Sequence, residues 1–135
     1  GKPFEINIKL LTLLLDNDFV PVLTVPILDE NGFAINTEND DIVRVLKESI
    51  NADTIISLIE APGFLEDKDD ESTLIKQMSQ IELERRESQV VGRMKRKVLA
   101  LRKLFEKGHC KVILTDGRVE NPISDAMNGG GTIIE

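Results

Sequence analysis

Residues 92–97, GRMKRK, place four cationic side chains within six residues of a chain whose formal net charge is -7. Apolar residues recur at helical spacing after Gly92, at Met94, Val98, Leu101 and Phe105, so this segment is expected to open a helix. Cations at a helix start oppose the helix dipole, whereas the free N–H groups there attract anions. The segment is therefore either a solvated basic face or a place where phosphate is held.

Helical geometry separates the cations of this segment. Lys97 directly precedes the apolar Val98, and Arg93, four residues earlier, shares its side of the helix. Lys95 and Arg96 point more outward and are expected to be solvated. We expect Lys97 to reach inward, toward a cleft.

A second group of polar residues lies in the segment NTEND. Asn36 and Asp40 are four residues apart at the start of another expected helix. A carboxylate there can orient a lysine ammonium or a metal, and an amide can bind a carboxylate. Ordinary helix capping by Thr37, with Asp40 three residues later, explains the same residues equally.

Composition limits the other kinds of chemistry. The acidic balance argues against a broad nucleic-acid footprint, and the apolar runs are too short to span a membrane. The single cysteine, Cys110, excludes a disulfide framework within the chain. His109 is the single histidine and follows Gly108 at an expected helix-to-strand junction, away from the expected ligands, so Ser/His or Cys/His catalysis is not expected. A buried, reduced thiol suits a cytoplasmic protein, and no metal-ligand set is expected. Because the first residue is Gly, the chain is processed, carries an expression remnant or is a fragment.

Strand-like and helix-like runs alternate along the sequence. Helices are predicted for residues 8–18, 36–51, 79–87, 92–108 and 120–129, and strands for residues 3–8, 19–28, 53–60, 73–79, 109–116 and 131–135. This order predicts one α/β domain over residues 1–135, a three-layer sandwich with helices on both faces of a mostly parallel sheet. Ligands of such sheets lie beyond the carboxyl ends of the strands, at residues 34–40, 59–72, 90–97 and 115–122.

Several segments in order resemble the amino-acid kinase family. They are FVPVLTVPI, INTENDD, IISLIEAPGFL, GRMKRKVLAL and ILTDGRVENPISDAMNGGGTIIE. The chain is most similar to carrier-protein-linked aminoadipate and glutamate kinases of archaeal lysine and arginine biosynthesis, and to acetylglutamate kinase. The resemblance covers the C-terminal, nucleotide-binding half of such an enzyme, so a missing N-terminal half is implied.

The resemblance implies an ATP-dependent carboxylate kinase. It would convert the side-chain carboxylate of an amino-modified glutamate or 2-aminoadipate, free or attached to a carrier protein, to an acyl phosphate. Mg²⁺ would be carried by the ATP. The resemblance also implies a cytoplasmic homodimer that binds neither nucleic acid nor membrane. This chain alone is expected to be inactive, because half of the active site is missing.

Roles for individual residues follow from the same resemblance. Asn36 matches a substrate-binding residue, Asp40 a residue that organises the catalytic lysines, and Lys97 the lysine that stabilises charge on the transferring phosphoryl group. The expected nucleotide-binding residues are Glu60, Ala61, Pro62, Gly63, Phe64, Leu65, Gly92, Arg93 and Met94.

The chain departs from the family pattern at a few positions. Ile59 and Glu60 stand where relatives usually have Thr-Asp, and the residues after Asp40 are bulkier and more charged. An alternative is therefore a non-catalytic split or degenerate half that binds nucleotide or a partner chain. A third hypothesis is an α/β domain without a ligand.

Overall fold

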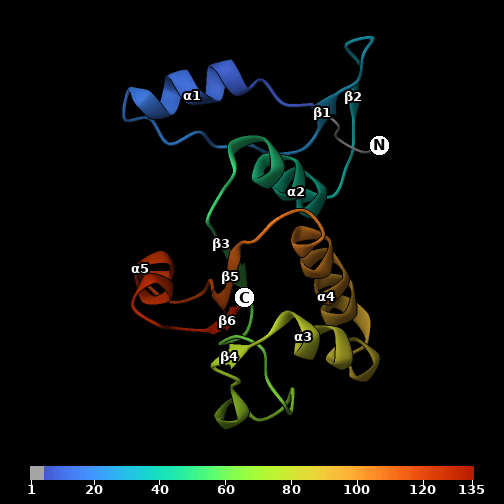
Figure 1. Cartoon of the computed structure of the whole chain (residues 1–135), viewed down its shortest axis with the longest axis vertical. Coiled ribbons are helices and arrows are strands. Elements are labelled where there is room, and N and C mark those ends of the chain that lie inside the picture. The colour runs from blue at the N-terminus through green and yellow to red at the C-terminus, as the bar shows by residue number, and fades with distance from the viewer. Residues whose placement is uncertain (1–4) are drawn as a thin grey trace. The chain divides into compact units, whose positions relative to one another are not determined.

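The computed structural model describes residues 5–135 (Figure 1). The chain divides into two compact units, Gly1–Ala52 and Asp53–Glu135, which are described one at a time. The expectation of a single domain stays a prediction.

The first unit contains two helices and a short hairpin. Its elements are α1 (Ile8–Asp16), β1 (Ile27–Leu28), β2 (Ala34–Ile35) and α2 (Asn39–Ile50). The strands pair antiparallel, with Ile27 opposite Ile35. The Asp29 carboxylate accepts hydrogen bonds from the N–H groups of Asn31 and Phe33, at 2.9 and 2.8 Å, and so fixes the turn between them.

Most of the strand predicted over residues 19–28 is wrong. Only Ile27–Leu28 belongs to a strand, and Val20 and Val22 are 87% and 88% exposed. A strand needs a partner for its backbone groups, and none of the described residues pairs with this segment upstream of β1. The strand predicted over residues 3–8 falls partly outside the described residues, and residues 5–7 form no strand.

The helix cap predicted at Thr37 is also wrong. Helix α2 begins at Asn39 after Glu38, which makes no side-chain capping hydrogen bond. The buried hydroxyl of Thr37 has no hydrogen-bond partner among the described residues. Because the helix starts two residues beyond Thr37, that hydroxyl is not placed to accept from the first turn.

The second unit is built on a four-stranded sheet with the order β3-β5-β6-β4. Its elements are β3 (Thr54–Ile59), a 3₁₀ turn (Glu71–Thr73), β4 (Gln77–Met78), α3 (Gln80–Arg86), a second 3₁₀ turn (Glu87–Gln89), α4 (Gly92–Phe105), β5 (Lys111–Asp116), α5 (Pro122–Met127) and β6 (Thr132–Ile134). The β3/β5 and β4/β6 pairs are parallel, and β5/β6 is antiparallel. The predicted α/β class with a mostly parallel sheet is confirmed.

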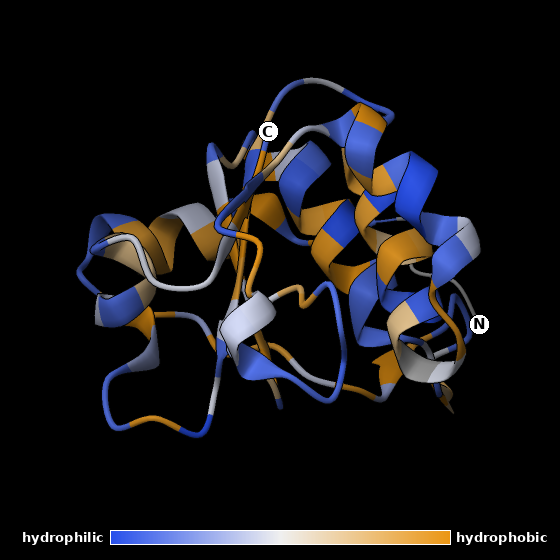
Figure 2. Cartoon of the chain, turned by 90° about the horizontal axis from the view of Figure 1, so that it is seen from below, coloured by the Kyte–Doolittle hydropathy of each residue, from blue (hydrophilic) through white to orange (hydrophobic). Residues whose placement is uncertain are grey.

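Helices cover both faces of this sheet. Figure 1 shows α5 on one side of the strands and α3 with α4 on the other. Figure 2 shows mainly hydrophobic colour along the central strands. Along α3 and α4 it shows hydrophobic and hydrophilic residues in alternation. Residues 112–115 of β5 are all buried, as expected for a strand enclosed on both faces. From the helices, Leu83 and Val98 join this core with no exposed surface.

The cap predicted at Ser79 is confirmed. The Ser79 hydroxyl oxygen accepts a hydrogen bond from the N–H of Glu82 at 3.2 Å and so satisfies one of the unpaired donors of the first turn of α3.

Replacing Ser79 is expected to destabilise the chain. In Ser79→Ala that donor loses its partner, and the free energy of unfolding should fall by about 1 kcal/mol. Ser79→Asp keeps an acceptor at the cap and should retain most of the stability. Urea denaturation followed by circular dichroism measures both variants. Equal losses in the two would show that the cap is not the cause.

Candidate functional site

The carboxyl ends of β3 and β5 lie side by side. Ile59, the last residue of β3, is paired with Asp116, the last residue of β5, and Gly117 N–H donates to the Ile59 carbonyl at 2.9 Å. The loops that follow the two strands therefore leave the sheet at the same end, beyond the carboxyl ends of the strands. We call this end the carboxyl edge of the sheet, and in open α/β sheets it is where ligands bind.

The loop of residues 60–65 is fixed by the hydroxyl of Thr132, at the start of β6. That hydroxyl accepts from the N–H of Phe64 at 2.8 Å and donates to the carbonyl of Ile75 at 2.6 Å. The N–H of Ile75 returns a hydrogen bond to the Phe64 carbonyl at 2.9 Å. Thr132 is completely buried, so these bonds form away from competing water.

Close packing at Gly63 leaves no room for a side chain. A Cβ atom there would lie 2.6 Å from Thr132 Oγ1 and 2.8 Å from Leu74 Cδ1. The neighbouring Phe64 is buried in the core. Gly63 and Phe64 thus hold the loop in place, whereas Glu60 is exposed and Pro62 is half-buried. Ala61 and Leu65 are also half-buried. Nucleotide binding by residues 60–65 stays a prediction.

An ion pair between Arg118 and Asp116, which the sequence analysis did not predict, lies at the carboxyl edge of the sheet. Arg118 Nε and Nη2 donate to the two carboxylate oxygens of Asp116, at 2.8 and 2.7 Å. This hydrogen-bonded fork lowers the pKa of Asp116 to about 2. The hydrogen bond to Asp116 is also the main cause of the raised pKa of Arg118, to which the nearby charges of Glu71 and Glu60 add. The edge therefore carries an ionised carboxylate bound to a guanidinium.

The amino end of α4 leaves open space beside its backbone. Gly92 has φ of +61°, a conformation that favours glycine, and a Cβ there would meet nothing within 4 Å. The first turn carries no acidic residue. Met94 and Lys97 are half-buried, whereas Lys95 and Arg96 are exposed. The predicted separation of Lys97 from the outward Lys95 and Arg96 is confirmed. Arg93 lies in the first turn of the helix, and the prediction for its side chain falls outside what the structure describes.

The amino end of α4 and the loop of residues 60–65 belong to one end of the second unit. A short connection joins the end of α4, at Phe105, to the start of β5, at Lys111. Figure 1 shows α4 running opposite to β5, so the amino end of the helix lies at the carboxyl end of the strand. Two of the predicted nucleotide-binding segments thus lie toward the carboxyl ends of the strands.

Asn36 and Asp40 belong to the first unit. Asn36 is exposed and directly follows β2, and the half-buried Asp40 is the second residue of α2. Lys97 and the loop of residues 60–65 belong to the second unit. A joint role for the two sets stays a prediction.

Residues 5–135 contain no group of three or more His, Cys, Asp or Glu side chains that could hold a metal ion. None of the helices within these residues is both long and apolar enough to cross a membrane. Cys110 is a buried free thiol, as predicted.

Comparison with known sequences identifies relatives along the whole chain. A profile described as "Amino acid kinase family" matches residues 1–116. LysW-aminoadipate kinase of Thermus thermophilus is 38% identical over 136 residues, which cover 99% of this chain and 51% of that protein. Acetylglutamate kinase of Archaeoglobus fulgidus is 33% identical over 140 residues, covering 100% of this chain and 48% of the relative. The chain thus spans about half the length of these curated relatives.

Solved structures share the fold at lower identity. N-acetylglutamate synthase from Neisseria gonorrhoeae, complexed with coenzyme A and L-arginine, has a TM-score of 0.83 and 19% identity, over 97% of this chain and 31% of that one. Carbamate kinase from Giardia lamblia bound to AMP-PNP has a TM-score of 0.73 and 20% identity, over 98% of this chain and 46% of its own.

Removing the Thr132 hydroxyl is expected to release the loop of residues 60–65. Thr132→Val leaves the N–H of Phe64 and the carbonyl of Ile75 buried without that partner, which should lower the free energy of unfolding by about 3 kcal/mol. Thr132→Ser keeps the hydroxyl and should cost clearly less. Urea denaturation measures the loss, and amide exchange should accelerate at Phe64 more than at Val112. Equal losses in the two variants would contradict a role for the hydroxyl.

The Asp116–Arg118 pair is expected to make stability depend on pH in acid. Because the pKa of Asp116 is lowered from 3.8 to about 2, its stabilising contribution is present above pH 3.8 and lost as the pH falls through about 2. Arg118→Ala should raise the pKa of Asp116 toward its ordinary value, measured by NMR titration of the carboxyl carbon. Arg96→Ala, which removes an exposed cation from α4, should leave that pKa unchanged; a similar shift in both variants would contradict the pairing.

Proposed function

The chain belongs to the amino acid kinase family, and on that premise we propose that it forms the nucleotide-binding part of a carboxylate kinase. The complete enzyme would transfer the γ-phosphoryl group of ATP to the side-chain carboxylate of an amino-modified glutamate or 2-aminoadipate. The products would be ADP and an acyl phosphate. The relatives named as aminoadipate and acetylglutamate kinases support this substrate class. Their place in lysine and arginine biosynthesis, and an acceptor attached to a carrier protein, belong to the same proposal.

The position of Lys97 in α4 is the observation that best supports this proposal. Lys97 is half-buried and is the sixth residue of α4, whose amino end lies toward the carboxyl ends of β3 and β5. Phosphoryl transfer needs positioning and positive charge at the equatorial oxygens more than it needs covalent chemistry. A lysine held against the protein surface, near a helix amino end, supplies both.

The residues at this end fit a nucleotide phosphate chain. The backbone at Gly92 borders open space, and no acidic side chain in the first turn of α4 opposes an anion. Mg-ATP brings the phosphoryl group and the divalent charge that the reaction needs. Gly92, Arg93 and Met94 would bind the phosphates, and the loop of residues 60–65 would hold the rest of the nucleotide. Lys97 would stabilise the negative charge of the group being transferred.

Residues of the first unit complete the proposal. Asn36 would bind the acceptor through its amide, and the Asp40 carboxylate would orient the catalytic lysine ammonium groups. The remaining half of the enzyme would bring the second lysine and most of the acceptor site. A homodimer of the complete enzyme, as the family resemblance implies, is part of the same proposal.

Lys97→Ala is expected to lower kcat of the complete enzyme about 100-fold or more, because a charge that stabilises the transition state is lost. KM for ATP should change much less. Lys95→Ala is the matched control, since it removes an exposed cation from the same helix, and its kcat should stay within about threefold of the wild type. Phosphoryl transfer to N-acetylglutamate and to aminoadipate derivatives is the measurement. A Lys97→Ala enzyme within about threefold of wild type would sink the proposed role.

Calorimetry with Mg-ADP separates this function from the alternative of a non-catalytic half. Heat of binding together with phosphoryl transfer by the complete protein supports the kinase. Binding without any transfer would favour a degenerate half, for which the departures at Ile59 and Glu60 are the sequence argument.

A further inference from the structure

Three cations of α4 have no part in the proposed kinase site. Lys95, Arg96 and Lys103 are exposed, and none of them forms an ion pair with another of the residues that the structure describes. Lys95 and Arg96 also lie near the amino end of the helix, where the helix dipole disfavours positive charge. Neither the stability of the helix nor the proposed phosphate site accounts for these charges.

The sequence of α4 leaves its positive charge without neutralising residues. The helix contains no acidic residue over Gly92–Phe105, although the chain has 24 Asp and Glu residues. Glu and Lys spaced four apart commonly stabilise an exposed helix surface, and α4 has no such pair. Of its cations, Arg102 is bound by Glu84 and Glu87, which belong to the preceding helical segments. The exposed cations have no equivalent partner of this kind.

These exposed cations share the outward side of α4. Lys95, Leu99 and Lys103 are spaced four residues apart and so follow one stripe along the helix, with Arg96 beside it. Leu101, which is 2% exposed, marks the opposite, buried side. Lys95 and Lys103 are separated by about 12 Å along the helix axis. We call Lys95, Arg96, Leu99 and Lys103 the cationic face of α4.

We propose that the cationic face of α4 binds an acidic segment of another protein. Carboxylates of that segment pair with Lys95, Arg96 and Lys103, which are spread over about two turns of helix. Leu99, 39% exposed in the middle of the stripe, contacts an apolar side chain of the segment. The proposal goes beyond the kinase activity, because it uses cations that the proposed reaction does not need.

The other large polyanions fit this face less well. The formal net charge of -7 repels the long, continuous negative charge of a nucleic acid. A helix that lies on a membrane inserts an apolar face, whereas Leu99 is the one apolar side chain among the four residues of the cationic face. A short acidic segment matches both the local charge and the length of the stripe.

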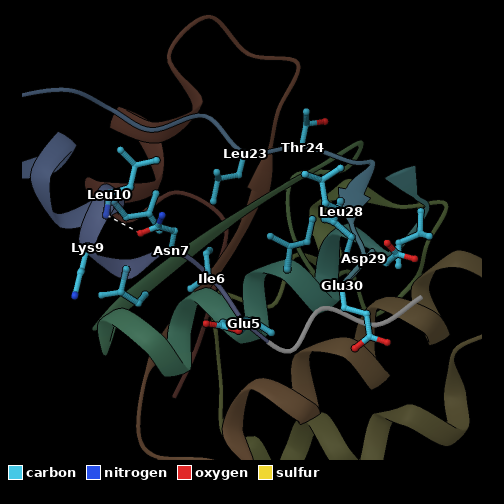
Figure 3. A pocket seen from close by; sticks show the side chains of 16 residues that line it. Glu5, Ile6, Asn7, Lys9, Leu10, Leu23, Thr24, Leu28, Asp29 and Glu30 are labelled. Carbon is cyan, nitrogen blue, oxygen red and sulfur yellow. Dashed lines mark hydrogen bonds between the residues drawn. The ribbon is translucent and has the colours of Figure 1, made fainter. Parts of the chain in front are cut away.

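The hollow of the first unit is not suited to the same partner. It has a volume of about 1370 Å³ and a mainly apolar lining. Figure 3 shows Glu5, Asp29 and Glu30 around it, and Lys9 is the one cation among the residues that line it. Carboxylates of an acidic segment would be repelled there, so α4 is the favoured place for such a partner.

The test uses the full chain and a synthetic peptide in which a central Leu is flanked by Glu on both sides. Fluorescence anisotropy should show saturable binding with a dissociation constant below about 100 µM at about 50 mM salt. At about 500 mM salt the affinity should fall at least about tenfold, because exposed charges are screened. Amide shifts in NMR spectra should centre on residues 95–103. None of these measurements needs ATP, so a failed kinase assay does not decide them.

Variants of the cationic face locate the contact. The triple variant with Lys95→Ala, Arg96→Ala and Lys103→Ala should weaken peptide binding at least about tenfold. Lys95→Arg together with Lys103→Arg keeps the charges and should leave the affinity within about threefold. Leu99→Ser removes the apolar contact and should weaken binding about threefold.

A matched control removes the same charge elsewhere. Lys9→Ala, Lys76→Ala and Lys111→Ala together take three exposed cations from other parts of the chain. This control should leave the affinity for the peptide within about twofold, because its cations lie outside α4. Circular dichroism checks that each variant is folded.

Four outcomes overturn the proposal. The first is no binding at about 1 mM peptide, a concentration far above the expected dissociation constant. The second is an equal loss of affinity in the control and the triple variant, which would assign binding to net charge. The third is tighter binding of duplex DNA or of phosphatidylserine vesicles than of the peptide. The fourth is self-association of the chain alone that the triple variant abolishes, which would make a second copy the partner.

Discussion

The arrangement of the second unit depends on one buried hydroxyl. The Thr132 hydroxyl bonds two residues that are both distant from it in sequence. Its oxygen accepts a hydrogen bond from the N–H of Phe64, and its O–H donates to the carbonyl of Ile75. With these bonds in place, Gly63 can pack directly against Thr132, and the loop after β3 leaves the sheet in a single direction. The loop predicted to hold the nucleotide is thus positioned by contacts with the core.

Two groups of positive charge lie at the end of the second unit where β3 and β5 have their carboxyl ends. Arg118 is engaged by the Asp116 carboxylate, with Glu60 and Glu71 nearby, so its positive charge is largely balanced by neighbours. The first turn of α4 carries no acidic residue, and its backbone N–H groups present partial positive charge. The N–H groups of that turn therefore favour an anion at the amino end of α4.

The sequence predicted well what depends on local pattern. The apolar repeat of α4, the continuous apolar runs of β3 and β5, and the cap at Ser79 all appear where expected, because each follows from neighbouring residues. Features that depend on distant contacts could not be predicted. The strand expected over residues 19–28 lacks its partner, and nothing local to Thr132 indicates its hydrogen bond to Phe64. The Asp116–Arg118 pair is different, because the two residues are only two positions apart and the sequence analysis missed a local contact. At Thr37 the residue types were right for a cap, but the helix starts two residues later.

The order of strands in the sheet has a consequence for how the protein is made. β3 pairs with β5, from far along the chain, and the loop that follows β3 is anchored in part by Thr132 in β6. During synthesis the loop of residues 60–65 leaves the ribosome long before its anchor does. Contacts this distant in sequence form slowly, since the intervening chain must first be closed into a loop. The segment proposed to bind nucleotide can therefore complete its anchoring only after β6 has been synthesised.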